Sequence, residues 1–147
     1  MIRAFVEQDI PLLVELVRLN TPKYFDPTEE TDYLQYLSQE AEHYYVVEQD
    51  DQVIGGGGFN LGFDQGKTAR ISWDVIHPDF HGKGIGRELT QFRIRAIKKY
   101  PEVKRIVVRT TQLVHEFYTK AGFQLVEVVK DFWAKGFDLY LMDMKVG

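Results

Sequence analysis

Residues 75–99 read VIHPDFHGKGIGRELTQFRIRAIKK, and they join the end of an expected strand to an expected helix through a glycine-rich turn. The strand covers residues 67–76, where apolar and polar side chains alternate. The helix covers residues 84–100, where apolar side chains recur at helical spacing on one face. Between them, the turn HGKGIG at residues 81–86 places three glycines in six positions. A glycine-rich turn that leads from a strand into a helix is typical of a backbone that binds an anion.

The physical basis of this interpretation is the start of the helix. The first N–H groups of a helix lack intrahelical acceptors, and the helix dipole is positive at this end. Glycine lets the backbone approach an anion without a Cβ clash, and Lys83 and Arg87 add positive charge. The residues therefore predict a pyrophosphate-type cradle, with a tight helix-entry turn as the alternative. A dinucleotide fingerprint would need a third glycine where Arg87 stands, so NAD or FAD is not expected.

Two other glycine clusters compete for the same interpretation. Residues 61–68, LGFDQGKT, end like a nucleotide-triphosphate loop, but Leu61 stands where that loop needs glycine and a strand pattern follows. A hairpin turn built on Asp64 and Gly66 is the expectation for this segment. The run GGGG at residues 55–58 lies inside an expected strand. Such a run indicates either close approach of a ligand or tight local packing, and the sequence leaves both open.

The remaining pattern predicts the order of elements along the chain. Asp9 is a plausible cap of a first helix, and Asp26 with Pro27 is expected to start a second, with Glu29 at capping-box spacing. Further strands are expected at residues 2–6, 44–48, 52–59, 104–110, 123–129 and 137–146, and a further helix at 112–121. The order β-α-α-β-β-β-α-β-α-β-β predicts a mixed sheet with helices on its faces, in the α+β or α/β class.

Composition limits the class of protein. The chain has 147 residues, 44% hydrophobic and 27% charged, which predicts one globular domain over residues 1–147. A net charge of -4 gives no general argument for nucleic-acid or membrane binding. The absence of cysteine excludes a cysteine nucleophile, disulfides and thiolate metal sites. No ligand spacing indicates a metal, and no apolar run approaches the roughly 18 residues of a membrane span, so we expect a cytoplasmic protein.

Two motifs together carry a resemblance to a known family. The first is the turn at residues 81–86, and the second is HEFYTKAGFQLV at residues 115–126. Both resemble the GCN5-related N-acetyltransferase (GNAT) superfamily: the first matches its acetyl-CoA loop, with His81 in place of the usual Arg or Gln, and the second matches its Phe-Tyr-x-Lys-x-Gly-Phe run. The resemblance implies an α/β sandwich with a mixed, mostly antiparallel sheet of about 6–7 strands, a central splay and about 4 flanking helices.

The resemblance also implies an activity. Acetyl-CoA would be the co-substrate, and its acetyl group would pass directly to a primary amine in a ternary complex, which needs no enzyme nucleophile. The loop backbone would hold the pyrophosphate of coenzyme A, and the backbone around a bulge near Val75 and Ile76 would pair with pantetheine and polarise the thioester carbonyl. The cofactor-binding residues implied are Val75, Ile76, His77, His81, Gly82, Lys83, Gly84, Ile85, Gly86, Arg87, Thr111 and Tyr118.

Catalytic residues follow partly from the resemblance and partly from position. Tyr118, in the Phe-Tyr pair, is implied to protonate the leaving thiolate, although a Tyr on an amphipathic helix is often only packed. Thr111 stands where the family often has Asn, and it could contact the cofactor or only cap the helix. Asp74 is our candidate general base, because we expect it to share a strand face with Arg70 and Ser72 and to lie near the implied position of the thioester. The alternative is that Asp74 forms a structural salt bridge, with Arg70 or Arg109.

The acceptor and the oligomeric state are less determined. Acidic and aromatic residues in segments 18–33 and 129–140 could attract a cationic amine of a small molecule or peptide, although acids also favour a helix N-terminus. Three alternatives stay open: a non-enzymatic acyl-CoA sensor, an acyltransferase that uses a different acyl-CoA, and a nucleotide-binding module that uses the Gly-Lys-Thr segment. The strand-rich C-terminus could support a homodimer, as it does in some relatives.

Overall fold

The computed structural model describes all residues, 1–147, and it confirms the predicted order of elements. Seven strands form one sheet in the order β1-β2-β3-β4-β5-β7-β6, with mostly antiparallel neighbours. The strands are β1 (Ile2–Ala4), β2 (His43–Gln49), β3 (Gln52–Phe63), β4 (Thr68–Ile76), β5 (Arg105–Thr110), β6 (Gln124–Ala134) and β7 (Phe137–Lys145). The helices are α1 (Ile10–Leu19), α2 (Glu29–Gln39), α3 (Ile85–Ile97) and α4 (His115–Lys120), with short 3-10 turns η1 (Glu7–Asp9) and η2 (Pro78–Phe80).

The chain divides into two compact units. The first comprises Met1–Asn60 and Ser72–Arg93, and the second comprises Leu61–Ile71 and Ile94–Gly147. Strands β3 and β4 and helix α3 each contribute residues to both units. The prediction of a single domain over residues 1–147 stays a prediction.

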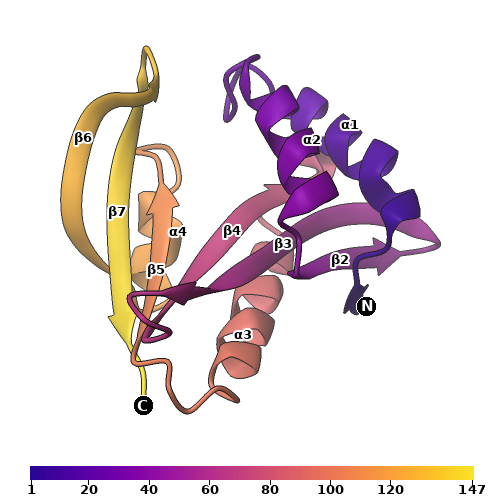
Figure 1. The fold of residues 1–147 in the computed structure, drawn as a ribbon. Coiled ribbons are helices and arrows are strands. Elements are labelled where there is room, and N and C mark those ends of the chain that lie inside the picture. The colour runs from indigo at the N-terminus through magenta and orange to yellow at the C-terminus, as the bar shows by residue number, and fades with distance from the viewer. The chain divides into compact units, whose positions relative to one another are not determined.

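The first unit buries apolar side chains on both faces of its strands. Helices α1 and α2 cover one face of β2 and β3, and α3 lies on the other (Figure 1). On the first face, Leu13 and Leu16 of α1 and Tyr33 of α2 belong to one cluster with Val46 of β2. On the second face, Ile85 and Leu89 of α3 pack with Val47 and Ile54. Successive strand residues thus face opposite layers, as a strand buried on both sides requires.

The glycine run at residues 55–58 is explained by packing in this unit. A Cβ on Gly56 would lie 2.8 Å from Cδ2 of Leu13 in α1. A Cβ on Gly57 would lie 2.5 Å from Oδ1 of Asp74 and 2.9 Å from Nη1 of Arg93. Glycine is therefore required because side chains from both layers approach the β3 backbone closely. Of the two interpretations left open by the sequence, the structure supports tight packing.

The second unit is built around three strands that run side by side, β5, β7 and β6 (Figure 1). Strand β7 pairs antiparallel with both of its neighbours. The start of β4, Thr68 to Ile71, pairs parallel with Arg105 to Val108 of β5, and the ladder ends there. The segment before β4 is a tight hairpin turn, in which Asp64 and Gly66 both have positive φ. The expectation of a turn at residues 61–68 is confirmed, because β4 follows it and not a helix.

Some element boundaries differ from the predicted ones. The helix expected at 112–121 is assigned only from His115 to Lys120, and the strand expected at 123–129 extends to Ala134. The second helix starts at Glu29, three residues after Asp26, although the side chain of Glu29 accepts a hydrogen bond from the Asp26 N–H as the capping box requires. Asp9 precedes α1, but its carboxylate pairs with Arg3 and accepts from the Val6 N–H at η1, and it makes no cap hydrogen bond to α1. Long-range partners override local propensity at these ends.

Candidate functional site

The glycine-rich turn lies between the end of β4 and the start of α3, as predicted. Gly82 and Gly84 have φ of 74° and 84°, a left-handed conformation that favours glycine. No heavy atom lies within 4 Å of a Cβ built on either residue, and residues 81–84 are exposed. Ile85, the first residue of α3, is buried and anchors the helix beneath the turn. The backbone here is accessible to a ligand at the positive end of a 13-residue helix.

The side chain of His81 holds the start of this turn to the end of β4. Its Nε2 lies 2.9 Å from the carbonyl oxygen of Ile76, where it donates the hydrogen bond. The same carbonyl accepts a second hydrogen bond from Nδ2 of Asn20, which is 4% exposed. The ring of Tyr24 meets the imidazole edge-on at 5.4 Å between centroids. His81 thus positions the loop in this structure, a role the sequence did not indicate.

The other residues of the predicted cofactor set are distributed around this junction. Val75 is buried and Ile76 half-buried at the end of β4. His77 accepts a hydrogen bond from the Asp79 N–H on Nδ1 and donates its own N–H to Ile54. The charged side chains of Lys83 and Arg87 are exposed beside the glycines, as a site for an anion requires. The only left-handed residue in β4 is Trp73, with φ of 49°, two residues before the expected bulge at Val75 and Ile76.

Asp74 forms an ion pair with Arg93 of α3, whose side chain is fully buried. About 25% of the Asp74 side chain is exposed. Burial raises the pKa of Asp74, and the charge and hydrogen bond of Arg93 oppose that shift. The salt bridge that the sequence kept open therefore exists, but its partner is neither Arg70 nor Arg109. The spacing of Arg93, four residues from both Leu89 and Ile97 on the apolar stripe of α3, was the sequence signal that was missed.

The expectation that Asp74 and Ser72 share a strand face is wrong. The hydroxyl of Ser72 donates to Oδ1 of Asn60, which also accepts from Tyr36 of α2. Asp74 instead faces α3, on the opposite side of the strands. The left-handed conformation of Trp73 between them interrupts the alternation of side chains. The role of Asp74 as a general base stays a prediction.

Tyr118 and Thr111 belong to the second unit. Tyr118 is 4% exposed in α4, and its ring makes edge contacts with Phe117 and Phe123 at 5.0 and 5.7 Å. The Phe123 N–H donates to the Tyr118 carbonyl, which closes the helix at the left-handed Gly122. The hydroxyl of Thr111 accepts from the Leu113 N–H and so caps the turn before α4. Their predicted roles toward a cofactor stay predictions.

The acidic residues of the first unit are mostly engaged within the protein. Asp26 accepts hydrogen bonds from Thr28, which lower the pKa of its carboxyl. Glu30 pairs with Arg18 at 2.8 Å. Glu29 differs, because burial raises its pKa to about 7, and the nearby charges of Asp26 and Asp32 act in the same direction.

The acidic residues of the last hairpin are also engaged. Oδ1 of Asp131 accepts from the Gly136 N–H, and Oδ1 of Asp138 accepts from the Asp131 N–H. The side chain of Gln112 ties the same turn to the chain before α4, through the Gly136 carbonyl and the Asp138 N–H. These carboxylates stabilise a rigid turn, and the expectation that they attract a cationic amine gains no support from their contacts.

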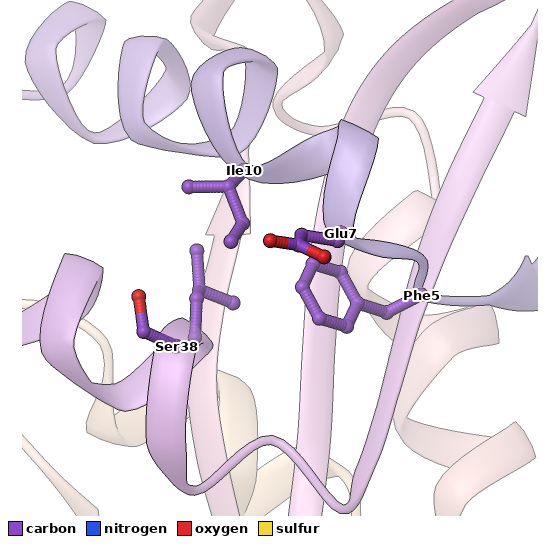
Figure 2. Close-up of a pocket in the computed structure, with 5 residues that line it drawn as sticks. Phe5, Glu7, Ile10 and Ser38 are labelled. Atoms are coloured by element: carbon purple, nitrogen blue, oxygen red, sulfur yellow. The ribbon is translucent and has the colours of Figure 1, made fainter.

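A surface pocket of ≈ 270 Å³ lies elsewhere, between the start of α1 and the end of α2 (Figure 2). It is lined by Phe5, Glu7, Ile10, Leu37 and Ser38. None of the predicted site residues lines it, so we do not assign the cofactor to it. No group of three or more His, Asp or Glu side chains is arranged to hold a metal ion. None of the helices has both the length and the apolar character needed to cross a membrane.

Comparison with protein families supports the motif interpretation. The model of the Acetyltransferase (GNAT) family matches residues 10–123. An N-alpha-acetyltransferase of Sulfurisphaera tokodaii is 23% identical over 150 residues, covering 91% of this chain and 86% of that protein. The UPF0157 protein YqkA of Bacillus subtilis is 39% identical over 56 residues, and the match covers 38% of this chain and only 16% of that protein.

Solved structures show the same fold at low sequence identity. Ard1 from Thermoplasma volcanium has a TM-score of 0.83 and 17% identity, covering 100% of this chain and 97% of that chain. An aminoglycoside 6'-N-acetyltransferase complexed with coenzyme A has a TM-score of 0.77 and 15% identity, covering 99% of this chain and 96% of that chain.

Proposed function

The chain belongs to the acetyltransferase (GNAT) family, and we propose that it transfers the acetyl group of acetyl-CoA directly to a primary amine. The observation that carries this proposal is the exposed turn at residues 81–86, with two left-handed glycines at the start of α3. The residues fit a pyrophosphate, because open backbone N–H groups and two exposed cations stand at a helix N-terminus. Coenzyme A in the related aminoglycoside acetyltransferase adds support.

In this proposal the backbone holds the cofactor. N–H groups from Gly82 to Arg87 bind the pyrophosphate, and the hydrogen bond from His81 to Ile76 keeps the turn against β4. The backbone of Val75 to His77 pairs with the pantetheine arm through groups other than the Ile76 carbonyl and the His77 N–H, which form hydrogen bonds within the protein. A backbone N–H near Val75 stabilises the negative charge that develops on the thioester oxygen. Thr111 is proposed to contact the cofactor as well.

The chemistry balances without an enzyme nucleophile. The nitrogen of the neutral amine attacks the thioester carbonyl carbon, a C–N bond forms, and the C–S bond breaks. The amine loses one proton, and the departing thiolate of coenzyme A gains one. We propose that the hydroxyl of Tyr118 donates the proton that the thiolate gains. The acceptor of the first proton is not assigned, because the ion pair with Arg93 favours a structural role for Asp74.

Thermal unfolding with ligands tests the cofactor. Acetyl-CoA should raise the Tm, and ATP and NAD should not. A well-folded sample whose Tm does not respond to acetyl-CoA would overturn the proposal. Gly84→Ala should weaken acetyl-CoA binding, since the added methyl occupies the anion cradle. Gly136→Ala is a matched control, because Gly136 has nearly the same φ, 86° against 84°, and equally open surroundings.

Turnover separates an enzyme from a binding protein. A panel of primary amines with acetyl-CoA, scored by release of free thiol, should identify an acceptor. Binding of acetyl-CoA without release for any amine would favour the acyl-CoA sensor. Release of free thiol from another acyl-CoA but not from acetyl-CoA would favour the alternative that the protein is an acyltransferase with a different acyl donor.

A further inference from the structure

Two arginines of the second unit lie on one face of its sheet. The parallel ladder places Arg70 of β4 beside Val107 of β5. Arg109 is two residues beyond Val107 on the same strand, so its side chain points to the same face. Both arginines are half-buried. The sequence suggested both as alternative ion-pair partners of Asp74, but Asp74 forms its ion pair with Arg93.

Aromatic rings hold both guanidinium groups. Cζ of Arg70 lies 3.9 Å from the centroid of the Phe63 ring. Cζ of Arg109 lies 5.2 Å from the centroids of both Phe132 and Trp133. A guanidinium that stacks on a ring keeps its N–H donors at its edges, where they suit the two oxygens of a carboxylate. The rings thus restrict both groups in a conformation suited to binding a planar anion.

One of the two rings that contact Arg109, that of Trp133, is anchored by a hydrogen bond. Nε1 of Trp133 donates to the Thr110 carbonyl at 3.2 Å. Phe132 and Trp133 lie at the end of β6, and the turn that follows them is closed by hydrogen bonds of Gln112, Asp131 and Asp138. Hydrogen bonds therefore anchor the Trp133 ring and the turn that follows it, whereas the Phe132 side chain is 45% exposed.

The local charge favours an anion. Partial burial lowers the pKa of Arg70, and the positive charge of Arg109 lowers it further, so the two cations repel one another in a partly dry environment. Asp143, a carboxylate of β7 on the same face, is held by Nε of Arg105 at 2.7 Å. Asp131 and Asp138 accept hydrogen bonds from backbone N–H groups. A bound carboxylate would relieve the repulsion between the two arginines.

We propose that Arg70 and Arg109, with Phe63, Phe132 and Trp133, form a binding site for the carboxylate of the amine acceptor. The acceptor class is then a small amino acid or amino-acid-like amine and not a polycationic amine. The identification of the ligand as the amine acceptor rests on the proposed function. The binding site itself consists only of residues of the second unit. Arg109 is the specificity residue that the test addresses.

Direct binding tests the site without requiring turnover. The probes are the 20 L-amino acids, their N-acetyl derivatives and the matching carboxamides, each titrated into the protein saturated with coenzyme A. At least one carboxylate probe should bind, and its carboxamide should bind roughly 10–100-fold more weakly, the range expected for a hydrogen-bonded charge. Arg109→Gln should remove this difference. No binding by any carboxylate, or an unchanged preference in Arg109→Gln, overturns the proposal.

Controls separate the possible causes of a loss. Arg105→Gln removes another arginine of the same strand and face, one that already has the partner Asp143, and should leave the carboxylate preference unchanged. Each variant is checked for its Tm and its Kd for acetyl-CoA, which Arg109→Gln should not change. If Arg109→Gln does not fold, Arg109→Lys keeps the charge but loses the two-pronged geometry, and should still reduce the preference.

A second set of titrations identifies the source of the carboxylate. Succinyl-CoA carries a carboxylate on the acyl group, whereas an amino acid carries it on the acceptor. If Arg109→Gln weakens the binding of succinyl-CoA but not of any amino acid, the carboxylate belongs to the donor and our assignment is overturned. Failure of the general function is a different result, because acetyl-CoA would then neither bind nor release thiol.

Discussion

The guanidinium of Arg93, fully buried in α3, forms an ion pair with the carboxylate of Asp74 on β4. The same guanidinium also donates to the Gly58 carbonyl and, through Nε, to the Leu89 carbonyl. One buried cation thus connects α3 to two strands of the first unit. Since β4 leads directly into the glycine-rich turn and α3 leads out of it, this pair stabilises both sides of the proposed cofactor loop.

Removal of one partner of the pair should be strongly destabilising. Arg93→Met leaves a mostly buried carboxylate, and Asp74→Asn leaves a buried guanidinium without its counter-charge, so each should reduce the free energy of unfolding by about 3–5 kcal/mol. Urea denaturation measures this change. The double variant should lose less than the sum of the single variants, because it leaves neither charge alone. Strict additivity would show that the pair does not couple the two elements.

Gly57→Ala tests the close packing over β3. The added Cβ would lie 2.5 Å from Oδ1 of Asp74, so the ion pair must shift, and we expect a loss of about 1–3 kcal/mol. Gly62→Ala is the control on the same strand. A Cβ added at Gly62 would have no neighbouring atom within 4 Å, but φ of this residue is 91°. Its loss should come from backbone strain alone, about 1 kcal/mol. A variant of Gly57 as stable as the parent would mean that the run of glycines has another cause.

Tyr118→Phe tests the proposed proton donor. Without the hydroxyl, the turnover number should fall about 10²-fold or more while the Kd for acetyl-CoA stays the same. Steady-state kinetics and calorimetry measure the two quantities. Tyr140→Phe is the matched control, because Tyr140 lies in β7 and packs on His115. Equal turnover in the parent and in Tyr118→Phe would exclude Tyr118 from this role.

Glu29 should make stability depend on pH. Its pKa in the folded protein is about 7, above the ordinary value of 4.5, so the folded state binds more protons than the unfolded state between these values. The contribution of Glu29 to the free energy of unfolding therefore falls as the pH rises from about 4.5 to about 7. Glu29→Gln should be more stable than the parent at pH 8, by roughly 1–2 kcal/mol after solvent screening, and similar at pH 4.

Glu30→Gln is the control for that experiment, because the pKa of Glu30 is shifted in the opposite direction. Arg18 lowers the pKa of Glu30, so the stability from this pair is present above the ordinary pKa and is lost as the pH falls. Glu30→Gln should equal or fall below the parent at pH 8 and approach it at low pH. Thermal unfolding at pH 4 and pH 8 measures both variants. If Glu29→Gln and Glu30→Gln shift the Tm in the same direction at pH 8, the assignment for Glu29 is wrong.

The order of elements and the position of the glycine-rich turn could both be predicted from the amino-acid sequence. Both depend on local physical chemistry: the period of apolar residues distinguishes strand from helix, and glycine at 82 and 84 permits the left-handed backbone. The hairpin at residues 61–68 followed from the same kind of signal, because turn residues were followed by a strand pattern. The second helix and the last strands were found with shifted ends, since end residues respond to distant partners.

Which side chains contact one another could not be predicted from local sequence patterns, because the contacts join residues far apart in the chain. The reason for the glycine run became visible when Leu13, Asp74 and Arg93 were found against it. The left-handed Trp73 separated Asp74 from Ser72, against the alternation expected of a regular strand. Whether an arginine binds a carboxylate or a ring depends on strands far apart in the sequence, as Arg70 and Arg109 show. Periodicity specifies a face of an element, but only packing specifies what that face contacts.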